Sequence, residues 1–323
     1  AAALESASDS TGRFCLDTSE IVKPGNLSIL RRLLQTKVPM PGMDGAVPEV
    51  GFADGAVSVV STLIGAGGAC TQALLSEGLG TLLIEVLSRR ETHVRDLCPR
   101  SIVTGVRGLA SLASTEVYGA RVFLATGIVD FVVELLQLGH LDNLLAWPGH
   151  LGGGQEGLDI LVCSVCDLLG TGIAGNSHSQ HLSALHQTIA KSKTVLHLTR
   201  AASRVSSSRL IILMAALWRL VPIHASQLQQ FVEGGGLDPR FVATILDPKR
   251  EIPLITDSLL ILSQLARVHK IFYEALGDSQ VHVHLSPLLA HKDAGIRAKT
   301  CNLIGNLCRH SSYFYAALEN ESI

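Results

Sequence analysis

Two cysteines and two histidines have spacing that resembles a zinc site. Cys163 and Cys166 are separated by two residues, and His178 and His181 follow with the same separation. Cysteine and histidine at such intervals are typical ligands of Zn²⁺. The cysteines, however, stand within LDILVCSVCDLLG, an apolar phrase with helical spacing, whereas a zinc finger places its cysteine pair on a turn. We therefore predict a buried helix here. The alternative is a metal-dependent enzyme built on these four residues, which stoichiometric zinc would reveal.

Other residues with chemical potential fit structural roles better. His282 and His284 have no cysteine or carboxylate at ligand spacing. The glycine-rich stretches at 65–68 and 78–80 neither follow a strand nor continue into GK[ST], so they indicate helix ends rather than phosphate loops. We find no paired carboxylates and no nucleophile elbow. The sequence predicts no catalytic residue, no metal site and no cofactor.

A basic, serine-rich stretch follows in the second half of the chain. Arg200, Ser203 and Arg204 precede three consecutive serines, Ser206 to Ser208. This pattern resembles a site for a basophilic kinase, and a phosphate there could pair with a nearby arginine. Short basic and serine-rich stretches are also common between helices. We therefore predict a solvated connector.

A recurring apolar phrase defines the elements that must position these residues. Each copy ends in a leucine followed by a short break, and successive leucines are 42 to 57 residues apart. The phrases are VSTLIG at Leu63, GLASLA at Leu112, CDLLGT at Leu169, LWRLVP at Leu220, LSQLAR at Leu265 and IGNLCR at Leu307. This period is expected when two or three helices form each stacked unit.

A second phrase accompanies the first in several units. It contains a glycine turn and then aliphatic residues at helical spacing, in SEGLGTLLIEVL, ATGIVDFVVELL and EGGGLDPRFVATIL. The two phrases together predict an all-α fold, an α-solenoid of about six armadillo- or HEAT-like repeats. Both repeat classes satisfy the same leucine spacing, so the pattern does not separate them.

Composition supports a folded helical chain. Hydrophobic residues make up 47% of the 323 residues, charged residues 17% and aromatic residues 4%, so Leu, Val, Ile and Ala must form the core. The 26 basic and 28 acidic residues give a net charge of −2, which provides no net attraction to nucleic acid or anionic lipid. The most apolar run, 210–218, ends at Arg219, short of the roughly 20 residues that a membrane span needs. We expect neither nucleic acid nor membrane as a partner.

The ends and the cysteines suggest a cellular context. The chain opens AAALESASDS, without an initiator Met or a signal peptide pattern, so we expect it to begin inside a longer protein. Seven cysteines, scattered through apolar phrases, suit a reducing compartment. We predict a cytoplasmic protein.

The pattern divides the chain into a short tail and one array. Residues 1–20 are predicted to be a flexible N-terminal segment, and 21–323 the repeat array. Within the array, 26–35 is predicted to be a helix with Leu27, Leu30, Leu33 and Leu34 inward. Stretches rich in Pro and Gly predict long loops near 36–55 and 139–157. Each loop is either a partner-binding insertion or flexible filler.

Two residues in the last repeat have recognisable roles. Asp293 has the place of a helix N-cap, and Arg297, four residues later, is expected to reach acceptors in an adjacent repeat. Asn306 stands where armadillo repeats place an asparagine that binds a peptide backbone. The equivalent positions in the other repeats are Thr62, Ser111, Leu168, Arg219 and Gln264. An asparagine ladder of the importin kind is therefore absent from the sequence.

The C-terminal stretch, HKDAGIRAKTCNLIGNLCRHSSYFYAAL at 291–318, resembles the final armadillo/HEAT repeat of the Fused family of serine/threonine kinases. The resemblance depends on IRAK at 296–299, Cys301, GNL at 305–307, RH at 309–310 and YFY at 313–315. Residues 259–276 are similar as well, whereas residues 1–200 match only the general repeat pattern. The alternative is that RHSSYFY is simply the cap of a solenoid, since terminal repeats are atypical.

The resemblance implies a non-catalytic scaffold segment of a Fused-like kinase. Such kinases have an N-terminal kinase domain, which would need ATP and Mg²⁺, and this chain lacks the glycine-rich loop, HRD and DFG motifs of that domain. Work at microtubule structures is implied, in the axoneme of cilia or flagella with its central apparatus, with kinesin-like or central-pair proteins as partners. The implied partner-binding residues are Arg297, Asn306, Arg309, His310 and Tyr313. The alternatives are an intramolecular regulator of the parent kinase domain and a generic armadillo adaptor unrelated to Fused.

Overall fold

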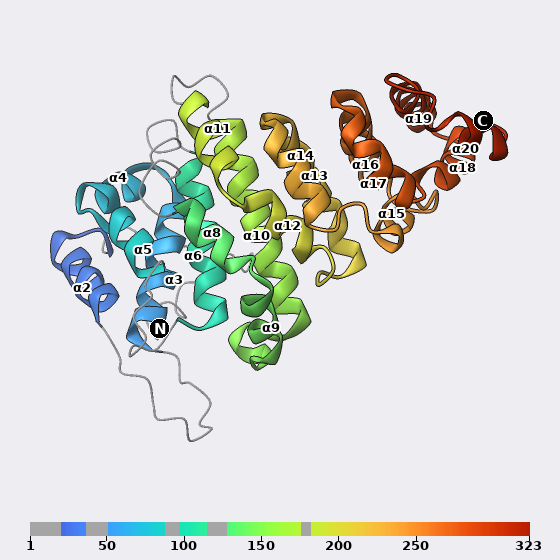
Figure 1. The fold of residues 1–323 in the computed structure, drawn as a ribbon. Helices are drawn as coiled ribbons and strands as arrows, with labels where there is room; N and C mark the ends of the chain where they lie inside the picture. Colours follow the sequence, from blue (N-terminus) through green and yellow to red (C-terminus); the bar gives the residue numbers. More distant parts are fainter. Residues whose placement is uncertain (1–20, 37–50, 88–96, 115–127, 176–181) are drawn as a thin grey trace.

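The computed structural model describes residues 21–36, 51–87, 97–114, 128–175 and 182–323. These residues form helices and short 3₁₀ turns, with no strand among them, and the helices stack side by side from the N-terminal to the C-terminal end (Figure 1). The predicted all-α solenoid is therefore confirmed. The predicted flexible segment at 1–20 lies outside the described residues, as does the 37–50 part of the predicted loop at 36–55. Residues 52–55 of that loop are helical.

Six helices carry the repeated leucine, and we call them the ladder helices. Each packs against the next one along the chain, and none of the six leucines is more than 2% exposed. They are α3 (Phe52–Ala66), α6 (Pro99–Ala113), α10 (Gly154–Gly175), α13 (Leu210–Leu220), α16 (Ile252–Val268) and α19 (Ala294–Leu307). The repeated apolar phrase thus forms one continuous core through the array, as expected for a solenoid.

The remaining described helices have 12 residues or fewer and lie alongside the ladder helices. They are α2 (Pro24–Gln35), α4 (Gly68–Ser76), α5 (Leu79–Leu87), α8 (Ile128–Leu135), α9 (Leu138–Ala146), α11 (Leu182–Lys191), α12 (Thr194–Ala201), α14 (Ala225–Glu233), α15 (Pro239–Ile245), α17 (Tyr273–Asp278), α18 (Leu285–Leu289) and α20 (Tyr315–Asn320). Five 3₁₀ turns lie between them: η1 (Gly149–Leu151), η2 (Ser207–Arg209), η3 (Val221–Ile223), η4 (Lys270–Phe272) and η5 (Val281–His284).

The first described helix follows the sequence pattern closely. α2 begins at Pro24, whose fixed φ and missing N–H suit the first helical turn. Leu27, Leu30 and Leu34 are buried as predicted, and Leu33 is half-buried against the same core. The helix packs against α3 and α5, so it belongs to the array.

The predicted loop at 139–157 is wrong for most of its length. Leu138, Leu141 and Leu144 have helical spacing and form α9, which ends before Trp147. The glycines after it are required by close packing: a Cβ at Gly152, where φ is +87°, would lie 2.7 Å from the Arg100 backbone nitrogen, and one at Gly153 would collide with the Trp147 carbonyl. This stretch is therefore a tight turn between α9 and α10.

Buried carboxylates connect successive ladder helices. The Asp54 carboxylate accepts hydrogen bonds from the backbone N–H of Gly51, at 2.8 Å, and of Cys98, at 2.9 Å, so one side chain caps both α3 and α6. Asp159 on α10 plays a similar role, because its Oδ1 accepts from the Ser206 N–H before α13, at 2.9 Å. Both side chains are buried.

Candidate protein-interaction surface

Tyr273, the first residue of α17, organises the C-terminal end of the array. Its ring is buried, its hydroxyl donates to the Asn306 carbonyl at 2.8 Å, and the same oxygen accepts from the His310 N–H at 3.3 Å. The hydroxyl thus satisfies two backbone groups at the C-terminal end of α19, where a helix leaves its carbonyls without partners.

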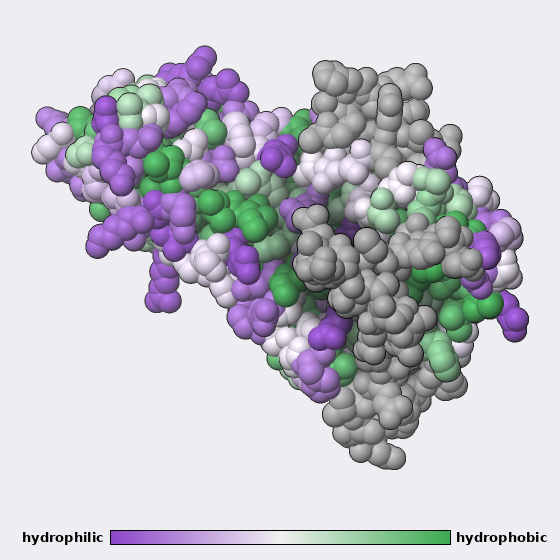
Figure 2. Space-filling view, turned by 180° about the vertical axis from the view of Figure 1, so that it is seen from behind, coloured by the Kyte–Doolittle hydropathy of each residue, from purple (hydrophilic) through white to green (hydrophobic). Residues whose placement is uncertain are grey.

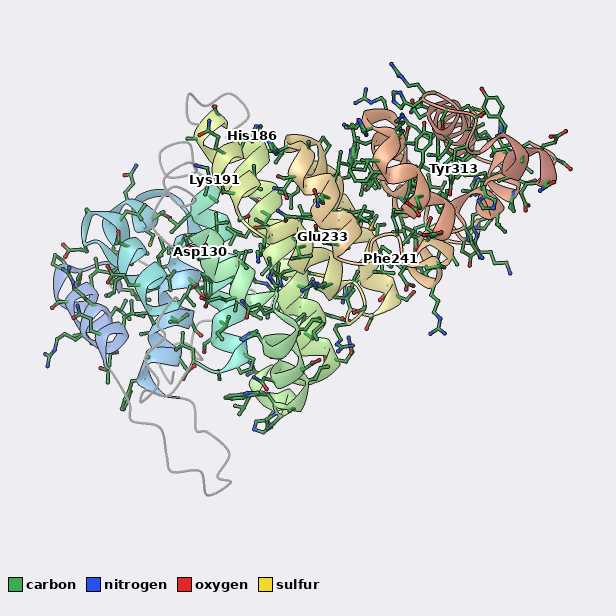
Figure 3. All side chains as sticks on the ribbon, in the orientation of Figure 1. Asp130, His186, Lys191, Glu233, Phe241 and Tyr313 are labelled. Carbon is green, nitrogen blue, oxygen red and sulfur yellow. The ribbon has the colours of Figure 1, made fainter. Side chains whose placement is uncertain are left out.

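Aromatic rings surround Tyr273. The ring centroid of Phe314 lies 5.5 Å away in an edge-to-face arrangement, and those of His310 and Tyr313 each lie 6.3 Å away. Phe314 is buried, whereas Tyr313 is 52% exposed. Tyr313 also lies over α17, since a Cβ at Gly277 would be 2.7 Å from its hydroxyl oxygen. Figure 3 labels Tyr313 at this end of the array.

The structure brings four of the five predicted residues together. His310 pairs through Nε2 with the Arg267 carbonyl at 2.8 Å, and the exposed Arg309 precedes it. Asn306 is also here but only 8% exposed, and its Nδ2 donates to Ser263 Oγ at 2.7 Å. Its amide therefore joins α16 to α19 and is already occupied.

Arg297 lies apart from this group. It is near the start of α19, ten residues before Leu307 at the end of that helix, which corresponds to about 15 Å of helix. Its Nη1 donates to the carbonyls of His291 and Lys292, at 2.9 and 3.0 Å. The prediction that it reaches an adjacent repeat is wrong, because these acceptors belong to the turn that precedes its own helix. Asp293 is confirmed as the N-cap, accepting from the Ile296 N–H at 3.0 Å.

Two exposed apolar residues that the sequence pattern had not singled out lie at the same end. Ile271, on η4, is 71% exposed, and Val268, at the end of α16, is 40% exposed. They flank the segment that leads into Tyr273. The signal was available, since RVHKIFY places one aliphatic residue at the end of the ladder helix and one after it. We call Val268, Ile271, Arg309, His310 and Tyr313 the C-terminal aromatic surface.

Further along the ladder, an arginine on α13 stands at the position equivalent to Asn306. Arg219 on α13 extends over α10, where a Cβ at Gly170 would lie 2.7 Å from its Nη1. On its other side is Asp257 of α16, whose carboxyl pKa is raised by burial and lowered in part by the Arg219 charge. Figure 2, the view from behind, shows hydrophilic and hydrophobic side chains mixed over the described surface, with a hydrophobic patch near the middle.

The cysteine pair lies inside a helix, as predicted. Cys163 and Cys166 are both on α10, and burial raises the pKa of both thiols, most strongly that of Cys166. His178 and His181 lie outside the described residues. Elsewhere in the described part of the chain, no three His, Cys, Asp or Glu side chains are grouped as metal ligands. His282 and His284 belong to the 3₁₀ turn η5.

The glycines that the sequence predicts as helix ends lie at helix boundaries. Gly67, Gly68 and Gly78 have positive φ at helix boundaries, which confirms them as helix ends.

In the described ranges, no single helix is long and apolar enough to cross a membrane. Only α4 and α5 taken together reach that length and composition, and they are bent by 75° at the break between them.

Sequence comparison finds relatives among serine/threonine kinases. No family model matches the chain. Serine/threonine-protein kinase TIO of Arabidopsis thaliana is 26% identical over 333 residues, which cover 85% of this chain and 25% of that protein. Serine/threonine-protein kinase 36 of Pongo abelii is 29% identical over 179 residues, covering 52% of this chain and 14% of the relative. The chain thus spans a quarter or less of these relatives.

Solved structures with a similar fold are armadillo proteins. A designed armadillo repeat protein superposes with a TM-score of 0.53 and 15% identity, covering 87% of this chain and 99% of that one. Another, in complex with the peptide (KR)4, gives a TM-score of 0.55 with 14% identity, again over 87% and 99%. At such low identity these matches show the fold alone.

The sequence similarity and the fold agree with the Fused resemblance. The described residues form a helical repeat region and contain no kinase fold, whereas the relatives are kinases several times as long. The chain is homologous to the Fused-type serine/threonine kinases and fits the C-terminal armadillo region of such a kinase.

Proposed function

We propose that this chain is a non-catalytic scaffold segment of a Fused-like kinase that binds protein partners at microtubule structures. The axoneme of cilia or flagella, with its central apparatus, is the proposed location, and kinesin-like or central-pair proteins are the proposed partners. Homology to kinases of this type over 85% of the chain supports the family context. The cofactors ATP and Mg²⁺ are proposed only for a kinase domain elsewhere in the parent protein.

The observation that carries the binding function is the C-terminal aromatic surface. It exposes Arg309 and Tyr313 after α19 and Ile271 on η4, and the Tyr313 ring packs against the buried rings of Tyr273 and Phe314. Tyrosine and arginine are enriched among residues that dominate binding energy at protein interfaces. Because Tyr273 and Phe314 hold Tyr313 from below, little side-chain freedom is lost when a partner covers it.

The test is an affinity capture from ciliated cells followed by mass spectrometry. The chain as it stands should enrich kinesin-like or central-pair proteins. The double variant Arg309→Ala with Tyr313→Ala should lose most of them, since both changes remove exposed contact area and leave the buried rings in place. Arg240→Ala with Tyr315→Ala is the matched control, because both residues are exposed and lie outside the C-terminal aromatic surface. Equal retention by all three proteins would contradict the proposed surface.

The second candidate is an intramolecular regulator. The relatives are kinases, so an array of this kind has a kinase domain in the same chain as a neighbour. Adding this chain in trans to the isolated kinase domain of the parent distinguishes the two functions. A regulator binds that domain and changes its phosphorylation rate, whereas the proposed scaffold leaves the rate unchanged. A generic armadillo adaptor unrelated to Fused would retain neither microtubule proteins nor the kinase domain.

A further inference from the structure

Ser207 occupies an exposed turn between two repeats. It is the first residue of η2, which leads directly into the ladder helix α13. Its side-chain oxygen accepts a hydrogen bond from Arg250 Nη1 at 2.7 Å, and its carbonyl accepts from Arg250 Nη2 at 2.6 Å. Arg250 is 43 residues further along the chain, immediately before α16. The guanidinium of Arg250, in the next repeat, therefore donates two hydrogen bonds to Ser207.

The positive charge of the Arg250 guanidinium is only weakly balanced by nearby negative charge. Its side chain is only 19% exposed, and its Nε is buried without a hydrogen-bond partner. The nearest carboxylate recorded for it is that of Glu251, 3.5 Å from Nε, on a side chain that is half exposed. The two outer nitrogens therefore donate to a neutral hydroxyl and a neutral carbonyl. A guanidinium that is largely removed from water is stabilised much more by an anion than by such neutral acceptors.

The helix that follows Ser207 favours a negative charge at this position. α13 has no acidic residue in its first turn and no side-chain cap, so an anion at Ser207 would also face the positive end of that helix. The buried carboxylate of Asp159 accepts through Oδ1 from the N–H of the neighbouring Ser206. Arg204 is paired with Asp142 at 3.0 Å, and the charge of Arg209 is felt at Cys163 on α10. Arg250 is thus the arginine that contacts Ser207.

We propose that Ser207 is a phosphorylation site and that Arg250 is the receptor for its phosphate. The donor is ATP, and the enzyme is a separate serine/threonine kinase that prefers basic substrates. Ser207 Oγ attacks the γ-phosphorus, the new Oγ–P bond forms, and the bond from that phosphorus to the bridging oxygen of ADP breaks. ADP leaves with the electron pair, and the hydroxyl proton passes to the general base of the kinase. Arg204, three residues before Ser207, supplies the basic residue that such a kinase reads.

The phosphate would tighten the joint between two repeats. Ser207 belongs to the α12–α13 connection, and Arg250 to the turn between α15 and α16. A phosphoserine adds close to two negative charges and three strong acceptor oxygens at pH 7. The neutral contact between the two connections then becomes a charge-assisted, bidentate pair. Because each repeat contacts only its neighbours, stabilising one joint stiffens the array at that place.

The chain contains a matched control for this site. Ser203 also has an arginine three residues before it, Arg200, and is also exposed. Its hydroxyl, however, donates to the Arg200 backbone carbonyl at 2.8 Å, instead of accepting from an arginine side chain as Ser207 does. The two serines therefore share the kinase signal and differ in the receptor.

The first test asks whether the site is modified. The whole chain is incubated with ATP, Mg²⁺ and the catalytic domain of a basophilic serine kinase, and the phosphorylated residues are mapped by mass spectrometry. We expect phosphate on Ser207. Phosphate on Ser203 with none on Ser207 would overturn the proposal.

The second test asks whether Arg250 receives the phosphate. Phosphoserine is installed at 207 or at 203 during translation, and the phosphate is titrated by ³¹P NMR. The second pKa of phosphoserine is ordinarily about 6, and we expect it to be lower by about half a unit at 207 than at 203. Arg250→Gln should remove that difference, and the phosphate at 207 should raise the melting temperature by about 2 °C only when Arg250 is present. Equal pKa values at the two positions in the unsubstituted protein would overturn the receptor assignment.

Discussion

At the scale of single residues, Asp159 joins two repeats through one carboxylate oxygen. Its Oδ1 accepts from the Ser206 N–H at 2.9 Å and from Gln155 Nε2 at 3.0 Å, and the side chain is buried. Asp159→Ala would leave both donors without this acceptor, so we expect the free energy of unfolding to fall by about 1–3 kcal/mol. Urea denaturation measures it. Asp167→Ala, an exposed carboxylate on the same helix, should change it by less than about 0.5 kcal/mol. Equal losses in the two variants would show that Asp159 has no special role.

His197 on α12 should make the stability depend on pH. Burial, together with the positive charges of Arg200 and Lys193, lowers its pKa from 6.5, and its Nδ1 is buried without a hydrogen-bond partner. Between the lowered folded pKa and 6.5, the unfolded chain binds more protons, so stability rises with pH and is lost as pH falls below about 6.5. We expect the decrease in melting temperature from pH 7 to pH 5 to be smaller in His197→Gln. His150→Gln replaces an exposed histidine and should show the same decrease in melting temperature as the unsubstituted chain. If His197→Gln also shows that same decrease, His197 is not the source of the pH dependence.

The residues of the candidate surface were predicted in part from the sequence. Three of the five predicted residues, Asn306, His310 and Tyr313, contact Tyr273, and Arg309 lies between them in the sequence at the end of α19. The sequence could not show that the Asn306 amide is used by Ser263, 43 residues earlier, since that contact exists only after two ladder helices pack. The prediction for Arg297 failed for a different reason: its acceptors are local carbonyls in the turn before α19, which no side-chain pattern reveals.

At the scale of helices, close approach between ladder helices depends on glycine. A Cβ at Gly108 on α6 would lie 2.8 Å from the Ser61 Cβ and 3.0 Å from its Cα, so α3 and α6 meet there backbone to side chain. Gly305, on the ladder helix α19, has no neighbouring atom within 4 Å of such a Cβ. A substitution at Gly108 therefore reports mainly on helix packing, whereas one at Gly305 reports mainly on helix propensity.

Alanine substitutions at these glycines should have opposite signs. Gly108→Ala should lower the free energy of unfolding by about 1–3 kcal/mol, because α3 and α6 must move apart. Gly305→Ala should raise it by about 0.5–1 kcal/mol, because alanine favours the helix and meets nothing. Thermal and urea unfolding of the two variants measures both changes. Stabilisation by both substitutions would mean that α3 and α6 do not pack as closely as described.

The ladder helices were the most predictable elements. Each contains the repeated leucine in a long apolar stretch with a helical period, and such stretches have few other ways to be buried. α9 was missed because Pro148 and the glycines at 152–154 dominate its neighbourhood, although Leu138, Leu141 and Leu144 have the helical spacing. Turn residues mark where a helix ends, and they say nothing about how long the helix before them is.

At the scale of the whole molecule, the described helices form a one-dimensional stack. Six ladder helices share a continuous core, and the last of them is closed by Tyr273, Phe314 and Tyr313 rather than by another ladder helix within the described residues. The solenoid itself follows from the repeated leucine, whereas the C-terminal surface follows from residues outside the repeat. Terminal units of such arrays are atypical because they meet solvent or a partner instead of a further repeat.

Crosslinking of the captured complex tests most directly whether a protein partner docks on the C-terminal aromatic surface. Lys270, between Val268 and Ile271, is exposed there, whereas Lys191 and Lys193 are exposed at α11 and α12, in the middle of the array. Lysine-reactive crosslinks, mapped by mass spectrometry, should join Lys270 to a kinesin-like or central-pair protein and should be lost in the Arg309→Ala, Tyr313→Ala variant. Crosslinks centred on Lys191 and Lys193, or reaching only the parent's kinase domain, would contradict the account.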